Sequence, residues 1–113
     1  YMVKGNELMV TKADKQPIGR YEYRKPFTNH TLNLKDVENI YMCSDGIQDQ
    51  FGGAKGKKFK IRRLKRLLVE LSQNEINKQK GMLSETFLDW KENEEQVDDV
   101  CFIGINVKNS LMN

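Results

Sequence analysis

The sequence predicts an α+β domain in which a pair of helices covers one face of a mainly antiparallel sheet. Apolar runs typical of strands occupy the first half of the chain and its end. A long segment between them places its apolar residues three and four positions apart, as a helix does. A short junction divides that segment in two, which is typical of antiparallel helix neighbours.

The first eleven residues are expected to form a hairpin. Two short apolar runs flank Lys4-Gly5-Asn6, where glycine and asparagine tolerate the positive φ of a tight turn. Residues 13–26 follow as a loop that holds both prolines. Residues 27–34 alternate between two sets of side chains, so we expect a partly exposed strand there.

The stretch from Asn39 to Gly53 is where we expect chemistry. A strand-forming apolar run at residues 40–43 ends at Ser44-Asp45-Gly46 and continues into a glycine-containing loop. Gly46 lets the backbone turn sharply beside Asp45. The Asp45 carboxylate is therefore expected at the rigid end of a strand, next to a loop that is open to solvent.

Helical periodicity is strongest in residues 59–72, and a second helix is expected from about residue 74 to residue 91. Gly81 weakens the second helix by about 1 kcal/mol relative to alanine. The apolar face of the first helix consists of Ile61, Leu64, Leu67, Leu68 and Leu71. That of the second consists of Met82, Leu83, Phe87 and Trp90.

The apolar run at residues 100–107 is the last expected strand, and Asp98 and Asp99 stand directly before it. Because the run is unbroken rather than alternating, we expect burial on both faces, with a cover that this segment does not contain. If it pairs antiparallel with residues 40–43, Asp45 meets this acidic pair at one edge of the sheet. Parallel pairing would separate them by a strand length of roughly 17–20 Å.

Carboxylates held this close need a compensating positive charge. At about 4 Å, two of them repel by about 4 kcal/mol at an effective dielectric of about 20, so a shared proton, a basic partner or a cation must lie between them. Carboxylate oxygens suit Mg²⁺ or Mn²⁺, whereas one histidine and two cysteines are too few for an ordinary zinc site. Successive strand residues point to opposite faces, so at most one of Asp98 and Asp99 is expected to join Asp45, and spacing does not choose between them.

The composition describes a soluble globular chain of 113 residues, 38% hydrophobic and 31% charged, without the roughly 20 apolar residues in a row that cross a membrane. Cys43 and Cys101 lie in strand-like runs and are expected to be buried, unpaired thiols in a reducing cytoplasm. His30 is expected to have a surface or structural role. Tyr1 lies in a strand-like segment, so we treat the chain as a fragment.

Basic residues are concentrated around the start of the first helix, where eight fall within twelve positions. The simplest interpretation is that these residues form the solvent-exposed side of the helix. The leucine stripe already defines the buried side, and no aromatic residues lie between the basic ones to stack on bases. The alternatives are recognition of an acidic or phosphorylated protein, and nucleic-acid binding. The residues are Lys55, Lys57, Lys58, Lys60, Arg62, Arg63, Lys65 and Arg66.

Three motifs occur in order along the chain. Residues 16–19 read Gln-Pro-Ile-Gly, residues 41–53 contain Ser-Asp-Gly and end in Phe-Gly-Gly, and residues 96–100 read Gln-Val-Asp-Asp-Val. In order and spacing these motifs resemble the bacterial serine/threonine phosphatases of the sporulation stage II protein E type, within the metal-dependent PPM superfamily. The resemblance predicts that residues 1–113 are the C-terminal portion of a single PPM-type phosphatase domain whose N-terminal portion is not present.

The resemblance implies an αββα sandwich of two antiparallel sheets, with a helix pair on each outer side and a two-metal Mn²⁺ or Mg²⁺ site at one end. It also implies that a metal-activated water attacks the phosphorus of a phosphoserine or phosphothreonine. Asp45 matches the ligand of the strand-end Asp-Gly motif. Asp98 matches the ligand of the late acidic pair, with Asp99 as the second choice.

Two departures from the family pattern bear on activity. Cys101 stands where this motif usually has threonine, which affects packing more than chemistry. The early aspartate motif that bridges the two metals, followed in relatives by Gly-His-Gly, is absent. The segment by itself is therefore expected to be inactive, even where the parent protein is an enzyme, and a non-catalytic interaction module is the alternative function.

The resemblance also implies partners. The substrate would be a phosphorylated regulatory protein such as an anti-sigma-factor antagonist, and the parent would carry an N-terminal sensory region. We expect no nucleic acid and no membrane contact by this segment. A homodimer in which two sheets stack is expected to cover the open sheet face.

Overall fold

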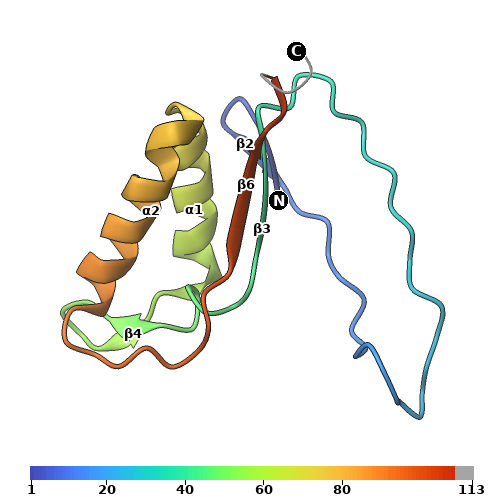
Figure 1. The fold of residues 1–113 in the computed structure, drawn as a ribbon, viewed down its shortest axis with the longest axis horizontal. Coiled ribbons are helices and arrows are strands. Elements are labelled where there is room, and N and C mark those ends of the chain that lie inside the picture. Colours follow the sequence, from blue (N-terminus) through green and yellow to red (C-terminus); the bar gives the residue numbers. More distant parts are fainter. Residues whose placement is uncertain (109–113) are drawn as a thin grey trace.

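The computed structural model describes residues 1–108 as a four-stranded antiparallel sheet with two helices on one of its faces (Figure 1). The strand order is β2-β1-β3-β6, and a separate two-stranded hairpin is formed by β4 and β5. This arrangement confirms the α+β prediction. The elements are β1 (Met2–Lys4), β2 (Glu7–Met9), β3 (Asn39–Cys43), β4 (Phe51–Gly52), β5 (Lys57–Lys58), α1 (Lys60–Ser72), α2 (Ile76–Lys91) and β6 (Phe102–Asn106).

The pairing of β3 with β6 is antiparallel, as predicted, and is the longest in the sheet. It runs from Asn39 opposite Asn106 to Cys43 opposite Phe102. The predicted N-terminal hairpin is also present, with Gly5 at φ +61° in the turn between β1 and β2. Because Cys43 and Phe102 are the last pair, the residues that follow β3 and those that precede β6 leave the sheet at one edge.

The core lies between the helix pair and the sheet. Both predicted helices are confirmed, and the apolar residues of α2 pack against this core. Ile61 departs from the prediction, because it lies in the first turn of α1 and is 39% exposed, so the buried stripe begins at Leu64. The core residues are Val3, Tyr41, Ile47, Phe59, Leu64, Leu67, Leu68 and Leu71.

The face of the sheet opposite the helices is open, as expected for a segment that does not contain the cover of its last strand. Met42 of β3 and Ile103 and Ile105 of β6 are 55%, 49% and 42% exposed. β6 is an edge strand, and nothing within residues 1–108 lies over its outer side chains. Burial of this strand on both faces stays a prediction, because residues 1–108 supply no cover for its outer face.

The predicted strand at residues 27–34 is wrong, since these residues form no regular structure. They belong to a long arm, residues 10–36, that projects away from the sheet (Figure 1). An alternating sequence forms a strand only beside a partner, and no described strand pairs with this segment. His30 lies in the arm and is exposed, as expected.

Two smaller expectations also change. The loop after Gly46 contains the hairpin β4–β5, which the sequence did not predict. Both cysteines are free thiols, but only Cys43 packs against the core, whereas Cys101 precedes the edge strand β6 and is exposed. No helix in the described range is long and apolar enough to span a membrane.

Candidate metal centre

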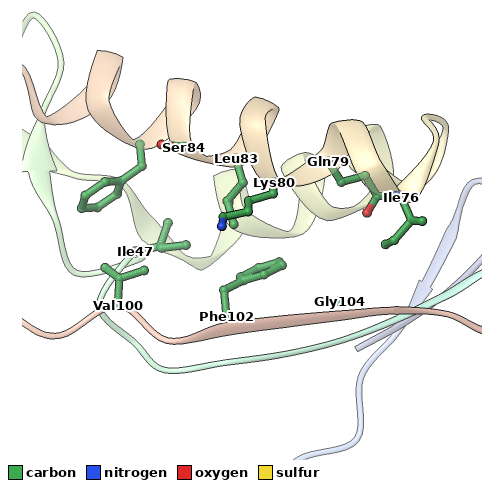
Figure 2. Close-up of a pocket in the computed structure, with 10 residues that line it drawn as sticks. Ile47, Ile76, Gln79, Lys80, Leu83, Ser84, Val100, Phe102 and Gly104 are labelled. Atoms are coloured by element: carbon green, nitrogen blue, oxygen red, sulfur yellow. The ribbon is translucent and has the colours of Figure 1, made fainter.

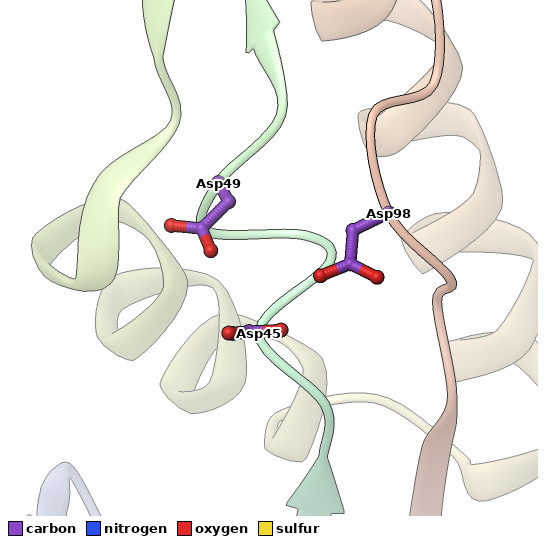
Figure 3. Close-up of side chains that lie close together, drawn as sticks. All are labelled: Asp45, Asp49 and Asp98. Atoms are coloured by element: carbon purple, nitrogen blue, oxygen red, sulfur yellow. The ribbon is translucent and has the colours of Figure 1, made fainter.

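The candidate site lies where β3 and β6 leave the sheet. Ser44 and Asp45 follow directly after the last residue of β3, and Asp98 to Cys101 lead into β6. The antiparallel register places these two segments side by side (Figure 3). Their proximity is therefore a consequence of the pairing of two apolar strands rather than of an attraction between acidic residues.

Ser44 fixes the distance between the two segments. Its Oγ donates a hydrogen bond to the Asp99 carbonyl (2.9 Å) and accepts one from the Cys101 N–H (2.9 Å). Its own N–H donates to the Cys101 carbonyl at 2.9 Å. These bonds hold the backbone of the late acidic segment against the residue that precedes Asp45.

Gly46 secures the same contact from the other side of Asp45. A Cβ at this position would clash with the Asp99 carbonyl oxygen and lie 2.8 Å from its carbonyl carbon. The φ of Gly46 is not positive, unlike those of Gly5, Gly19, Gly53 and Gly56. The glycine is thus required for close approach of two backbones rather than for the sharp turn that the sequence suggested.

Three carboxylates converge at this edge. Asp45, Asp49 and Asp98 each place one oxygen within 4.8 Å of the others (Figure 3). Asp45 and Asp98 are exposed, and Asp49 is partly buried. The structure thus brings together two of the three aspartates singled out in the sequence. The carboxylate of the third, Asp99, lies outside the cluster, and Asp99 contributes through its backbone.

Asp49 was not anticipated from the sequence. The Asp49 N–H donates to the Asp45 carbonyl at 3.0 Å, so residues 45–49 form one helical turn. Residues four apart lie on the same side of such a turn. The Asp-x-x-x-Asp spacing was therefore the available signal, but a single turn is too short to show helical periodicity.

Gln50 and Trp90 hold the loop that follows the cluster. The buried Gln50 side chain donates through Nε2 to the Glu95 carbonyl at 2.8 Å, which connects the Asp49 loop to the segment that leads to Asp98. The Trp90 indole N–H donates to the Gln50 carbonyl at 2.9 Å. Both residues position the cluster; the sequence predicted Trp90 only as part of an apolar helix face and gave no role to Gln50.

The electrostatics of the cluster favour a cation. The only ion pair to these carboxylates among residues 1–108 joins Lys58 Nζ to an Asp49 oxygen at 3.6 Å. Three carboxylates thus face one ammonium group, and the arrangement presents hard oxygen donors that converge on one point. That donor set suits Mg²⁺ or Mn²⁺.

An apolar groove adjoins the cluster, between α2 and the edge strand β6 (Figure 2). Its volume is about 470 Å³, and Ile47 and Val100 form the end nearest the aspartates. Leu83, Phe87 and Phe102 line its walls. Because Phe102 and Gly104 belong to β6, the groove borders the edge strand of the sheet.

Comparison with known proteins bears on the whole described chain. The family model described as Stage II sporulation protein E (SpoIIE) matches residues 1–108. A solved structure, the SiaA-PP2C domain of Pseudomonas aeruginosa, is similar with a TM-score of 0.58 and 25% sequence identity. The match covers 60% of this chain but only 28% of that one, so this chain spans less than a third of the solved chain. A search of curated proteins returned no match.

Proposed function

This chain belongs to the Stage II sporulation protein E family, and from that membership we propose that it is the C-terminal portion of a metal-dependent protein serine/threonine phosphatase domain. The family match and the likeness to a PP2C domain support a phosphatase-type domain. The proposed reaction is the hydrolysis of phosphoserine or phosphothreonine on a regulatory protein.

The observation that carries the proposal is the convergence of Asp45, Asp49 and Asp98 at the end of β3. Asp45 and Asp98 would hold Mn²⁺ or Mg²⁺, and Asp49 offers a third oxygen. Asp99 is the second choice for the late ligand. When bound, such cations supply the positive charge that holds phosphoryl oxygens and activates the attacking water. Ser44 and Gly46 keep the two ligand-bearing segments in contact.

We further propose that the site is completed by residues outside this chain. The open sheet face, with Met42, Ile103 and Ile105 exposed, fits a second sheet packed against it, as in an αββα sandwich. Alternatively, two copies of this chain would form a homodimer in which their open sheet faces stack on each other. By itself the segment would lack a principal ligand and be inactive.

The physiological partners belong to the same proposal. The substrate would be a phosphorylated switch protein, such as an anti-sigma-factor antagonist. The parent protein would act in the cytoplasm and carry an N-terminal sensory region that controls the phosphatase. These assignments rest on the family alone.

The test uses the full-length protein, stripped of metal with a chelator and resupplied with Mn²⁺ or Mg²⁺. Hydrolysis of an aryl phosphate and of a phosphoserine peptide should depend on the added cation. Asp45→Asn keeps the shape of the side chain but removes its charge, and we expect turnover to fall by roughly 100-fold or more, since even groups that only orient metal ligands cost about 10–100-fold. Calorimetry with Mn²⁺ should show weakened binding.

Asp36→Asn is the matched control, because Asp36 is an exposed carboxylate of the arm whose one ion pair within residues 1–108 is with Lys4 at 3.8 Å. Its φ of +60° suits asparagine, so turnover should not change. Undiminished turnover in Asp45→Asn would remove Asp45 from the site. An absence of both Mn²⁺ binding and hydrolysis in the wild type would instead identify a non-catalytic interaction module.

A further inference from the structure

The hairpin β4–β5 and the first residue of α1 carry a group of exposed lysines, here called the lysine hairpin: Lys55, Lys57, Lys58 and Lys60. From residue 50 to residue 69 the chain has eight basic residues and no carboxylate. A solvated helix face accounts for the basic residues farther along α1, whose leucines are buried. It does not account for three lysines that precede the helix.

The lysine hairpin is a fixed element. Gly53 donates its N–H to the Trp90 carbonyl at 2.9 Å, and a Cβ at Gly53 would lie 2.6 Å from the Trp90 ring. Gly52 is equally close, since a Cβ there would clash with the Trp90 carbonyl. The rings of Phe59 and Trp90 meet edge to face at 5.4 Å. The lysines are therefore presented from a rigid base that is anchored to α2.

This base adjoins the acidic cluster. Lys58 contacts Asp49 at 3.6 Å, and the Lys60 N–H donates to the Gln48 carbonyl at 2.8 Å. Figure 3 shows the ribbon of the hairpin continuing from Asp49. Within residues 1–108, no carboxylate forms an ion pair with Lys55, Lys57 or Lys60. An unneutralised positive surface thus lies beside the candidate metal centre.

We propose that the lysine hairpin binds acidic residues that flank the phosphorylated residue of the substrate protein. The inference rests on the proposed function, which places the phosphoryl group at the aspartate cluster. A segment that enters this site would pass beside the lysines, and carboxylates near the phosphoresidue would meet complementary charge. The substrate class is accordingly an acidic phosphopeptide segment.

The aromatic surroundings favour an acidic peptide over a nucleic acid. Binding of single strands depends on free aromatic faces for base stacking. Here Phe59 is buried, the Arg63 guanidinium lies 4.6 Å from the Trp90 ring centre, and Lys58 Nζ lies 5.7 Å from that of Phe51. The protein's own cations already occupy the rings next to the lysines.

The test measures binding to the full-length protein in an Asp45→Asn background, so that it does not depend on turnover. Two fluorescent phosphoserine peptides are compared by anisotropy, one with glutamates around the phosphoserine and one with glutamines in the same places. The hairpin variant is Lys57→Gln/Lys60→Gln. The control, Lys65→Gln/Arg66→Gln, removes the same charge from the part of α1 beside Leu8 of β2 and Val10 at the start of the arm.

The hairpin variant should lower the affinity for the acidic peptide by about 3- to 10-fold, as expected for the loss of two exposed ion pairs. Its affinity for the glutamine peptide should fall by less than about twofold. The control should leave both affinities within about twofold. About 0.5 M NaCl, which shortens the screening length to a few ångström, should abolish the difference. Equal losses for the two peptides, or no loss, would overturn the proposal.

A salt-sensitive oligonucleotide complex that the hairpin variant weakens, with peptide selectivity unchanged, would also overturn it in favour of nucleic-acid binding. Failure of the proposed function has a different signature. In that case the wild type hydrolyses no phosphoester with any added cation, whereas the anisotropy comparison still reports whether the lysines select acidic peptides.

Discussion

The acidic edge of the sheet and the arm of residues 10–36 both lie outside the regular elements, yet they are held in opposite ways. At the acidic edge, backbone meets backbone at contact distance through Ser44 and Gly46. In the arm, side-chain hydrogen bonds at the surface connect its two halves. Asp14 accepts two hydrogen bonds from Thr28, and the Gln16 side-chain amide pairs with the Lys25 backbone. The first arrangement fixes a segment to the core, whereas the second fixes only the shape of the arm.

This difference explains why the candidate chemistry lies at the sheet edge. A cation site needs several oxygens to keep their positions within a fraction of an ångström. Close backbone contact to two paired strands provides that precision. Side-chain hydrogen bonds in the exposed arm do not, although the arm carries several polar and charged groups. Three substitutions test the contrast, in order of decreasing expected effect.

Gly46→Ala should have the largest effect. The new Cβ would collide with the Asp99 carbonyl, so the segment that carries Asp98 must move away from Asp45. Such overpacking costs about 1–3 kcal/mol. We expect loss of cation-dependent hydrolysis in the full-length protein, together with faster hydrogen exchange in the residues that lead into β6.

Gly81→Ala is its matched control. Gly81 is exposed on α2, and a Cβ there meets nothing within 4 Å. Alanine should stabilise the helix by about 0.5–1 kcal/mol without affecting hydrolysis. Retention of full activity in Gly46→Ala would mean that the contact with Asp99 does not position the cluster.

Tyr41→Phe should have an intermediate effect, confined to stability. The Tyr41 hydroxyl donates to Gln79 Oε1 at 2.7 Å inside the core, and the loss of this bond costs about 0.5–1.5 kcal/mol. The urea midpoint of the full-length protein at neutral pH measures this loss. Tyr23→Phe in the arm, where the tyrosine is 70% exposed, should cause no change.

The same tyrosine gives a pH signature. Burial raises the pKa of Tyr41 from 10.0 to about 12. A raised folded-state pKa means that the stabilising term is fully present below pH of about 10 and is lost as the pH rises toward about 12. The wild type should therefore lose more stability in this window than Tyr41→Phe, and parallel losses would exclude Tyr41 as the source.

The same contrast separates what the sequence could predict from what it could not. Apolar runs and helical periodicity were enough for β3, β6 and both helices, and the antiparallel pairing then brought Asp45 beside Asp98. Spacing left Asp98 and Asp99 open, and no spacing encodes that the Asp98 carboxylate joins the cluster while the Asp99 carbonyl accepts a hydrogen bond from Ser44. Asp49 was missed because one helical turn carries no periodic signal.

The prediction of a strand within the arm was wrong for a different reason. Residues 27–34 alternate as a strand does, but strand formation depends on a pairing partner that local sequence does not specify. Phe27 and Leu32 accordingly remain exposed. Gly52 in β4 and Gly53 directly after it were visible in the sequence, whereas their contact with Trp90, which lies far along the chain, was not.

Asp14→Ala should have the smallest effect on the body of the protein and a clear one on the arm. It removes the two carboxylate oxygens that accept hydrogen bonds from Thr28. Oδ2 lies 2.5 Å from the Thr28 backbone nitrogen, and Oδ1 lies 2.8 Å from the Thr28 hydroxyl oxygen. Trypsin, which can cut at Arg20 and Arg24 in the arm, should cleave there several-fold faster. The melting temperature should stay the same. Asp14→Asn keeps one acceptor oxygen, so trypsin should cleave its arm at a rate between those of the wild type and Asp14→Ala.

Acid provides an independent way to open the same contact. The hydrogen bond from the Thr28 backbone, followed by that from its hydroxyl, lowers the pKa of Asp14 below its ordinary value of 3.8. A lowered folded-state pKa means that the contact is present above that value and is lost as the pH falls through the folded-state pKa. Pepsin cleavage of the arm should therefore accelerate with acidification in the wild type and not in Asp14→Ala, after correction for the activity of pepsin itself. A fall in the melting temperature of Asp14→Ala would show that the arm is coupled to the core and would remove the distinction between the two regions.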